Sequence, residues 1–330
     1  VNLTWIMTVR ADWYREHPEN RLGLLEAMKI KRGKFLGLDG STLVASRKRS
    51  GVYERTYPQG GMAPQLSGYS VARYGRSGLE QQYNAELTGE ASQLSVEHWV
   101  DRVLGRRPDG ADIRLTLVPD VQQEAQQLLS GRTGAIVALD PATGAVIASA
   151  SSPAYDPSRL ETSWKRLNAD KRTPLLNRVT QGLYQPGSSF KVVTAAGGLE
   201  TGKVRPTTRF VDRGTYAVGG GEVTNYAGTV YGPHDFAQAL ALSINTTFGK
   251  VGNELGRRRL MAAMESFGFF EAPPLPLPAG EVVASGRYGP DGLLGADAPM
   301  DDLAVAWAAC GQEQVLATPL QMALVAAGLA

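Results

Sequence analysis

The pattern of apolar and polar positions divides this chain of 330 residues into two stretches of different character. Up to about residue 108, short apolar runs alternate with turns that are rich in Gly, Arg and Tyr, and Lys34 to Ala45 is typical of a small hairpin. Only residues 20–29 have the spacing of an amphipathic helix there. The Gly105 to Gly110 segment has the composition of a linker. We therefore predict a strand-rich first domain over residues 1–108.

The second stretch, residues 109–330, has longer periodic segments. Asp140 to Gly144 is a turn sequence between two apolar runs and predicts a hairpin. Apolar residues with helical spacing follow, so we expect an α+β domain in which helices flank a sheet. The expected strands are 113–117, 135–139 and 145–150; the expected helices are 119–129, 188–200, 235–242, 246–266, 301–309 and 318 onward; and 271–292 is expected to be a long loop.

Composition narrows the function without identifying it. The net charge of +2 gives no electrostatic case for nucleic-acid binding. The single cysteine, Cys310, excludes an internal disulfide and a multi-cysteine metal site, and its apolar surroundings predict a buried, inert thiol. The histidines at 17, 98 and 234 lack metal-ligand spacing, and we expect His98 and His234 at the surface. No metal or organic cofactor is implied.

Both ends of the sequence have unusual features. The chain starts with Val, and the apolar run from Val1 to Val9 is shorter than the roughly 20 residues that span a bilayer. At the other end, residues 322–330 stop within an apolar helical pattern without a polar tail. We therefore expect a chain that is truncated at both ends.

The octet Tyr-Gln-Pro-Gly-Ser-Ser-Phe-Lys at 184–191 carries the strongest chemical signal. A Pro-Gly turn precedes an apolar helical run, so Ser188 lies at the helix start and Lys191 one turn later on the same face. A serine hydroxyl becomes a good nucleophile when a neighbouring base takes its proton, and burial among apolar residues lowers the pKa of a lysine. The helix N-terminus also favours a developing oxyanion.

A structural interpretation of the same residues is equally simple. Ser-x-x-Lys is short enough to occur about once by chance in a chain of this length. Ser188 alone would serve as a helix N-cap. The surrounding sequence has to decide between the two interpretations.

A second polar motif follows about 55 residues later, at Ser243-Ile244-Asn245. Either polar residue could cap the next helix. In a functional interpretation, the Ser243 hydroxyl would relay a proton and the Asn245 amide would hold a substrate amide. The order and separation of the two motifs match the set described for penicillin-binding proteins and serine β-lactamases.

The sequence resembles class B penicillin-binding proteins over nearly its whole length. Beyond the two motifs, the similarity in the second domain covers 134–157, 175–178, 243–248, 311–312 and 316–322. In the first domain, the similar segments are 31–33, 39–40, 57–58, 68–69 and 78–80, which resemble the non-catalytic pedestal that serves dimerisation or partner binding. Within the family, the chain is most similar to the actinobacterial elongation and division type.

The resemblance implies a membrane-anchored D,D-transpeptidase that works outside the cytoplasm, cross-links peptidoglycan stem peptides ending in D-Ala-D-Ala and is acylated by β-lactams. Ser188 would be the nucleophile, with its N–H in the oxyanion hole, and Lys191 the base. Ser243 would pass protons to the leaving group, and Asn245 would bind the substrate amide and Lys191. A membrane glycosyltransferase of the cell-wall machinery is the implied partner.

One family motif is absent from the sequence. The chain has no Lys-Thr-Gly or close variant, which in the family follows this region on a strand and binds the substrate carboxylate. Truncation before that strand explains its absence, so we expect an incomplete transpeptidase domain over 109–330.

Two other functions stay open from the sequence. A D,D-carboxypeptidase or β-lactamase would use the same nucleophile but transfer the acyl group to water. A non-catalytic scaffold or β-lactam sensor would act through the pedestal and would not cross-link stem peptides.

Overall fold

The computed structural model describes residues 28–90 and 109–330, which form two compact units. The first unit contains the described residues up to Gly134 together with Ile147–Leu176 and Pro276–Pro278, and the second contains the remainder. Most of the predicted helix over 20–29, most of the predicted linker at 105–110, and His98 lie outside the described residues.

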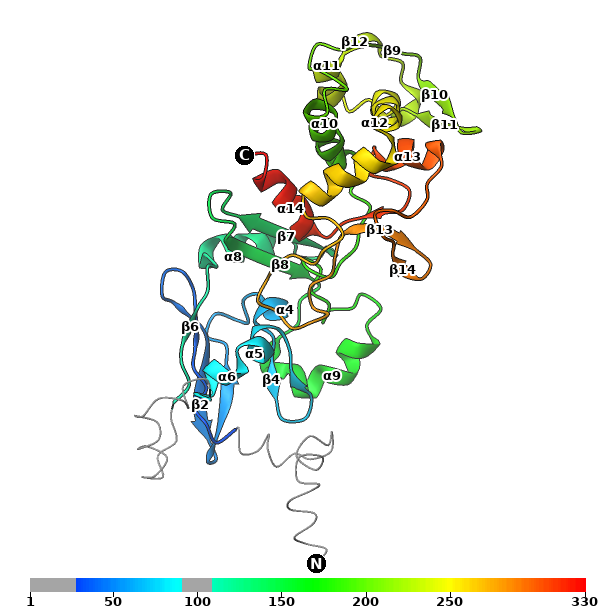
Figure 1. The fold of residues 1–330 in the computed structure, drawn as a ribbon. Coiled ribbons are helices and arrows are strands. Elements are labelled where there is room, and N and C mark those ends of the chain that lie inside the picture. Colours follow the sequence, from blue (N-terminus) through cyan, green and yellow to red (C-terminus); the bar gives the residue numbers. More distant parts are fainter. Residues whose placement is uncertain (1–27, 91–108) are drawn as a thin grey trace, which may run out of the picture. The chain divides into compact units, whose positions relative to one another are not determined.

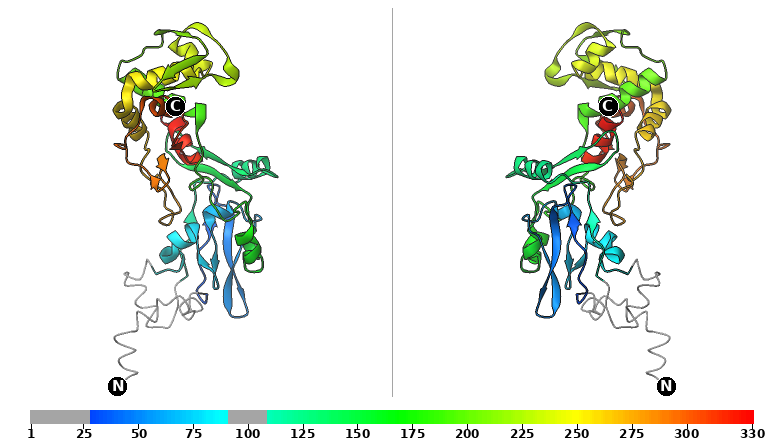
Figure 2. Two further views of the ribbon diagram at one scale, coloured as in Figure 1. Left: turned by 90° about the vertical axis from the view of Figure 1, so that its right-hand side faces the viewer. Right: turned by 90° about the vertical axis from the view of Figure 1, so that its left-hand side faces the viewer.

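The first unit contains a four-stranded sheet in the order β3-β2-β1-β6, whose long strand β2 is blue in Figures 1 and 2. β1 pairs antiparallel with β2 around Asp39-Gly40, which confirms the predicted hairpin, and parallel with β6. The helix α9 was not predicted, although Leu160 and Leu167 form its buried face. The elements are β1 (Phe35–Leu36), β2 (Thr42–Arg49), β3 (Val52–Thr56), α4 (Pro64–Ser67), β4 (Ser70–Val71), β5 (Gly75–Arg76), α5 (Gly78–Gln82), α6 (Asn84–Leu87), β6 (Ile113–Arg114), α8 (Pro119–Leu128), β8 (Val146–Ser152), η1 (Pro157–Arg159) and α9 (Leu160–Ala169).

A buried ion cluster links three segments of the first unit. Glu80 in α5 is fully buried, and its two carboxylate oxygens accept hydrogen bonds from Arg32 Nη2 at 2.8 Å and from Arg55 Nε at 2.6 Å. A buried charge is tolerated only when it is paired in this way. Arg32 and Glu80 belong to two of the segments on which the resemblance rested, and the fold brings them together.

The second unit combines short strands with longer helices. Its elements are β7 (Gly134–Leu139), η2 (Gly187–Phe190), α10 (Lys191–Glu200), β9 (Arg209–Asp212), β10 (Thr215–Val218), β11 (Gly221–Thr224), η3 (Tyr226–Gly228), β12 (Gly232–Asp235), α11 (Phe236–Ala241), α12 (Asn245–Ser266), β13 (Gly286–Gly289), β14 (Gly292–Leu293), α13 (Asp302–Ala308), β15 (Val315–Leu316) and α14 (Pro319–Ala327). The helices predicted for this unit are confirmed, although Gly256, with φ 71°, interrupts α12. The long loop predicted over 271–292 is wrong in part, because β13 pairs there with β15.

The helix α12 lies at the centre of this unit, between α10 and α13 (Figure 1). Buried apolar residues on its sides pack against both neighbours. Gly252 permits the close approach on one side, because a Cβ atom at that position would lie 2.4 Å from the Ala309 Cβ. This packing fixes the N-terminus of α12, which follows Ser243, relative to the start of α10, which carries Lys191. The two polar motifs of the sequence lie at these two helix ends.

Two residues outside the motifs test the predictions made from composition. Cys310 is fully buried, as expected. His234 is only 3% exposed, so its predicted surface position is wrong. It faces Phe210 in the antiparallel β9–β12 pair, and its Nε2 lies 2.8 Å from the Thr247 hydroxyl of α12. The strand pairing that buries His234 is not visible in the local sequence.

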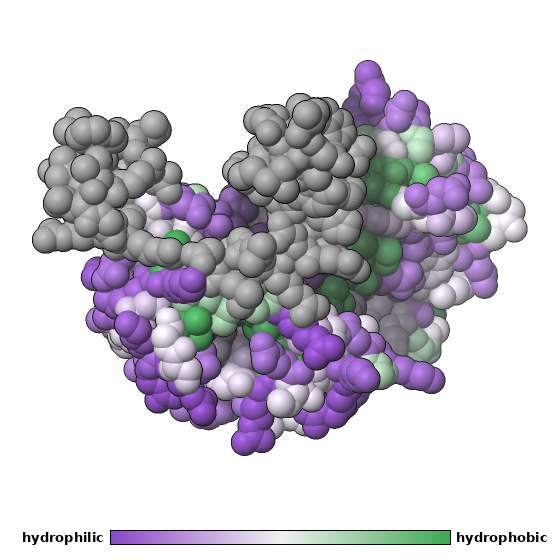
Figure 3. Space-filling view, turned by 90° about the horizontal axis from the view of Figure 1, so that it is seen from below, coloured by the Kyte–Doolittle hydropathy of each residue, from purple (hydrophilic) through white to green (hydrophobic). Residues whose placement is uncertain are grey.

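Hydrophilic residues dominate the face seen in Figure 3, with smaller hydrophobic areas between them. Within residues 28–90 and 109–330, no helix combines the length and apolar character that would be needed to cross a membrane.

Candidate active site

Ser188 lies in the short 3₁₀ turn η2 that leads into α10, and it is exposed. The turn is held from both sides. The Gly187 N–H donates to the Gly311 carbonyl at 2.8 Å, and the Lys191 N–H donates to the Ser188 carbonyl. Phe190 is fully buried and meets the Phe269 ring edge-on at 5.6 Å between centroids. The anchored turn therefore presents the Ser188 hydroxyl to solvent.

Lys191 follows as the first residue of α10, and its side chain is almost fully buried, at 1% exposure. Its Nζ lies 2.6 Å from the Ser243 carbonyl oxygen, 2.9 Å from Ser243 Oγ and 2.6 Å from Asn245 Oδ1. Three oxygen atoms of the second motif thus surround the amine of the first. Residues more than 50 positions apart form one polar cluster.

The surroundings of Lys191 disfavour its charged form. Burial lowers the pKa of Lys191. Burial raises the pKa of Cys310 to about 12, so this thiol is neutral at pH 7 and supplies no countercharge. Within the described part of the chain, no acidic side chain forms an ion pair with Lys191. The Phe248 ring, 5.5 Å away, gives the ammonium a modest compensation.

The cluster can accommodate either protonation state of Lys191. An ammonium has three N–H donors, which match the three oxygens around it. A neutral amine has two N–H donors and one lone pair, so the Ser243 carbonyl and Asn245 Oδ1 would accept while the Ser243 hydroxyl donates. A hydroxyl can donate or accept in this way because it has both a proton and lone pairs. Ser243 is therefore suited to carry a proton to or from Lys191.

Two local features direct the second motif toward Lys191. Ser243 has φ 57°, a left-handed conformation that is uncommon for a residue other than glycine and is often found at functional sites. This conformation lets its carbonyl and its hydroxyl both reach the same amine. Asn245, the first residue of α12, donates from Nδ2 to the Thr224 carbonyl at 2.9 Å. That bond assigns Oδ1 to the side facing Lys191.

The structure brings together three of the four residues that were predicted from the sequence. Lys191, Ser243 and Asn245 are joined by hydrogen bonds, and Ser188 lies one turn before Lys191. The Ser188 hydroxyl has no hydrogen bond within the described residues. Catalytic hydrogen bonds in unliganded enzymes are often long and shorten when substrate binds.

Residues 134–330 match the family of the penicillin binding protein transpeptidase domain, and residues 32–113 match the penicillin binding protein A dimerisation domain. The chain belongs to the penicillin-binding protein transpeptidase family. The resemblance stated from the sequence is confirmed, as is the predicted α+β fold with a strand-rich domain and a transpeptidase domain.

Relatives in this family are similar over the whole chain. The peptidoglycan D,D-transpeptidase PbpA of Mycolicibacterium smegmatis is 33% identical, with 100% of this chain aligned to 68% of that protein. PbpA of Mycobacterium tuberculosis is 31% identical, with 100% of this chain aligned to 69% of it.

Solved structures of penicillin-binding proteins have the same fold. The imipenem acyl-enzyme complex of penicillin-binding protein A from M. tuberculosis has a TM-score of 0.81 at 30% identity, covering 92% of this chain and 71% of that one. The D,D-transpeptidase domain of a peptidoglycan glycosyltransferase from Eggerthella lenta has a TM-score of 0.79 at 36% identity, covering 92% and 70%.

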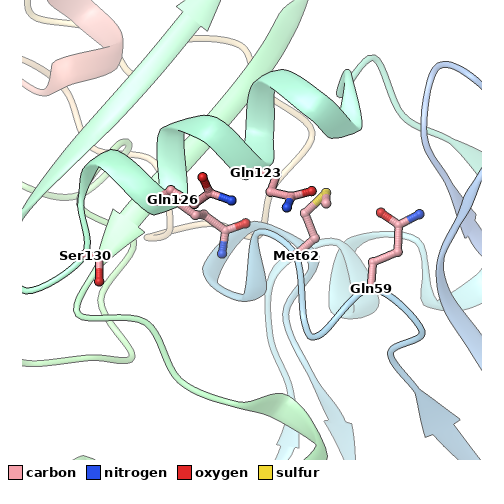
Figure 4. Close-up of a pocket in the computed structure, with 6 residues that line it drawn as sticks. Gln59, Met62, Gln123, Gln126 and Ser130 are labelled. Carbon is pink, nitrogen blue, oxygen red and sulfur yellow. The ribbon is translucent and has the colours of Figure 1, made fainter.

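A separate cavity lies in the first unit. It measures about 690 Å³ and lies beside α8, which contributes Gln123 and Gln126 (Figure 4). Gln59, Met62, Gln127 and Ser130 complete its lining, and none of these six side chains is charged at pH 7. Without a base or an acid among them, this lining does not make a catalytic site.

Sequence reasoning missed three residues that shape the candidate active site. Thr224 orients Asn245, Gly311 holds the turn of Ser188, and Asp212 contacts the residue after Asn245. Gly311 was part of the family resemblance but had no role assigned to it. For Asp212, the available signal was the Asp-x-Gly turn sequence at 212–214, which does not reveal a partner 34 residues away.

Proposed function

We propose that this chain acts as a serine D,D-transpeptidase that cross-links peptidoglycan stem peptides through an acyl-enzyme on Ser188. The observation that carries the proposal is the setting of Lys191. Its amine is buried, has no acidic partner in the described residues and is bonded to Ser243 and Asn245. A lysine in that setting can act as a base near neutral pH.

The first half-reaction is acylation. Ser188 Oγ attacks the carbonyl carbon of the penultimate D-Ala, and its proton passes to Lys191. The C–N bond then breaks, and the terminal D-Ala leaves as an amine after it receives a proton through Ser243. The Ser188 N–H, in the first turn of a helix, is one donor for the oxyanion. Asn245 binds the amide of the substrate through its side chain.

The second half-reaction transfers the acyl group. An amine of a neighbouring stem peptide attacks the ester on Ser188, a new amide forms, and the serine hydroxyl is regenerated. A β-lactam enters the same first step, because its strained amide acylates Ser188, and the opened ring stays attached. The acyl-enzyme structures of one relative, penicillin-binding protein A from M. tuberculosis, support this part of the proposal.

The wider setting of the enzyme follows from the same proposal. Residues 1–108 form a pedestal for dimerisation or partner binding, and residues 109–330 belong to the transpeptidase domain. The enzyme works outside the cytoplasm at the cell membrane, together with a membrane glycosyltransferase that supplies glycan strands. The match of residues 32–113 to a dimerisation domain supports the pedestal assignment.

The experiment that tests the proposal uses the protein in its full natural length. A stem-peptide analogue ending in D-Ala-D-Ala is supplied with an amine acceptor, and released D-Ala and cross-linked product are both quantified. We expect both products, and neither with Ser188→Ala. Release of D-Ala without cross-linking would identify a carboxypeptidase instead. Acylation by benzylpenicillin without D-Ala release would identify a sensor.

A further inference from the structure

Asp212, at the end of β9, is a buried carboxylate without a cation beside it. It is 2% exposed, and no lysine, arginine or histidine forms an ion pair with it in the described part of the chain. Burying an ionised group in this way is costly unless hydrogen bonds compensate for the lost water. Its position therefore requires a dense set of donors.

Four donors satisfy the carboxylate, two at each oxygen. Oδ1 accepts from the Thr246 hydroxyl at 2.6 Å and from the Gly214 N–H at 3.0 Å. Oδ2 accepts from Asn225 Nδ2 at 2.9 Å and from the Tyr231 N–H at 2.7 Å. Burial alone would raise the pKa of Asp212, but these hydrogen bonds outweigh it and keep the pKa below its ordinary value. The group is therefore ionised at neutral pH.

The two side-chain donors come from the segments that hold Asn245. Thr246 follows Asn245 at the start of α12, and Asn225 follows Thr224 at the end of β11. The Asn225 side chain also accepts from the Thr246 N–H at 3.1 Å. Asp212 and Asn225 thus join the two segments directly beside the bond between Asn245 Nδ2 and the Thr224 carbonyl.

We propose that Asp212 is a positioning residue for acyl transfer, which acts through Thr246 and Asn225 to hold Asn245 Oδ1 against Lys191. This inference rests on the function proposed above. We call the hydrogen bonds of Asp212 and Asn225 that join β11 to α12 the clamp. If the clamp loosens, Asn245 loses its fixed partner at Thr224, and its side chain can rotate. Lys191 then loses one of its three oxygens, and the substrate amide loses its oriented partner.

The chemistry of the clamp requires a carboxylate. A carboxylate offers two acceptor oxygens, each with two lone pairs, which match the four donors. An asparagine at position 212 would turn an NH₂ group toward two N–H or O–H donors, whichever way it was flipped. With the NH₂ group at the Oδ2 position, the bonds from Asn225 and Tyr231 are both lost; at the Oδ1 position the Thr246 hydroxyl can turn to accept, but the Gly214 N–H still loses its acceptor. Asp212→Asn is therefore expected to impair folding as well as acylation.

Thr246→Val is the sharper test, because it keeps the shape of the side chain and removes one hydroxyl. Thr246→Ser keeps the hydroxyl, and Thr180→Val is the matched control. Thr180 is also buried, at 1% exposure, and its hydroxyl donates to the Glu281 carbonyl at 2.6 Å, outside the Lys191 cluster. Each variant of the full-length protein is reacted with benzylpenicillin over a range of concentrations, which separates the acylation rate constant from the dissociation constant. Thermal unfolding is measured in parallel.

We expect Thr246→Val to lower the acylation rate constant by roughly 10- to 100-fold, the effect of misplacing a group by about 1 Å. Thr246→Ser should restore most of that loss, and Thr180→Val should acylate like the wild type at a comparable loss of thermal stability. If the wild type is acylated and Thr246→Val is acylated at the same rate, the proposed role of Asp212 is overturned, while the proposed function stands. Equal losses in Thr246→Val and Thr180→Val would also overturn it, since the effect would then be one of stability. Absence of wild-type acylation would overturn both proposals.

Discussion

Replacing Gly311 by alanine should displace the turn that carries Ser188 and so slow the acylation of Ser188. Gly311 has φ 73°, where an L-residue is strained by roughly 1–2 kcal/mol. A Cβ atom there would lie 2.2 Å from the Gly187 carbonyl oxygen and 2.5 Å from the Phe190 Cβ. Both atoms belong to the turn that carries Ser188, so the turn has to move.

The destabilisation expected for Gly311→Ala has two contributions, conformational strain and overpacking, which can be measured separately. Overpacking of this kind adds about 1–3 kcal/mol to the conformational strain. Gly202→Ala supplies the control, because Gly202 has φ 67° and an added Cβ would meet nothing within 4 Å. Gly202→Ala should therefore show the strain alone, and Gly311→Ala should show the strain and the displacement.

The assay is acylation by a fluorescent penicillin, with thermal unfolding measured on the same samples. We expect Gly311→Ala to be acylated roughly 100-fold more slowly than the wild type, because the Gly187 N–H would lose its bond to the Gly311 carbonyl and Ser188 would shift. Gly202→Ala should keep the wild-type rate. Equal acylation rates in the two variants would refute the reasoning that Gly311 holds Ser188 in place.

Three further predictions follow from the site and the core. In Asn245→Asp, a carboxylate beside Lys191 Nζ favours the ammonium and raises the pKa of Lys191, so the ascending limb of acylation against pH should move to higher pH; an unmoved limb would contradict the contact. Cys310 in the folded protein should resist iodoacetamide at pH 8 and react only after unfolding, as counted by mass spectrometry, and rapid labelling of the native protein would contradict its burial. Glu80→Gln should lower the free energy of unfolding by about 3–5 kcal/mol in urea titrations, since Arg32 and Arg55 lose their buried countercharge; an unchanged unfolding midpoint would argue against a structural role of the cluster.

The features that the sequence predicted well are those with a local cause. The helix over 246–266 follows from apolar spacing, and the hairpin at Asp39-Gly40 follows from turn chemistry. The Pro-Gly turn before an apolar run predicted that a helix begins at Ser188, and the 3₁₀ turn η2 leading into α10 confirms it. The family resemblance added Ser243 and Asn245, which local spacing alone could not distinguish from helix caps.

The features that the sequence did not predict depend on tertiary contacts. Strands β9 to β12 have only four residues each, which is too short for an alternating pattern in the sequence to identify them. Their pairing buries His234 and brings Asp212 to Thr246. These contacts form only when the strands pack against α12. The pattern of apolar and polar residues within one segment therefore cannot predict them.

The central claim is that Ser188 is the nucleophile, and intact mass after reaction with benzylpenicillin tests it most directly. The sample is the protein in its full natural length, with Ser188→Ala and the neighbouring Ser189→Ala as paired controls. Ser189 is a suitable control because its hydroxyl donates to the Pro186 carbonyl at 2.7 Å, within the turn itself. The account predicts one penicillin adduct per wild-type chain, the same adduct in Ser189→Ala and none in Ser188→Ala. A folded wild-type protein without an adduct, or an adduct that persists in Ser188→Ala, would contradict it.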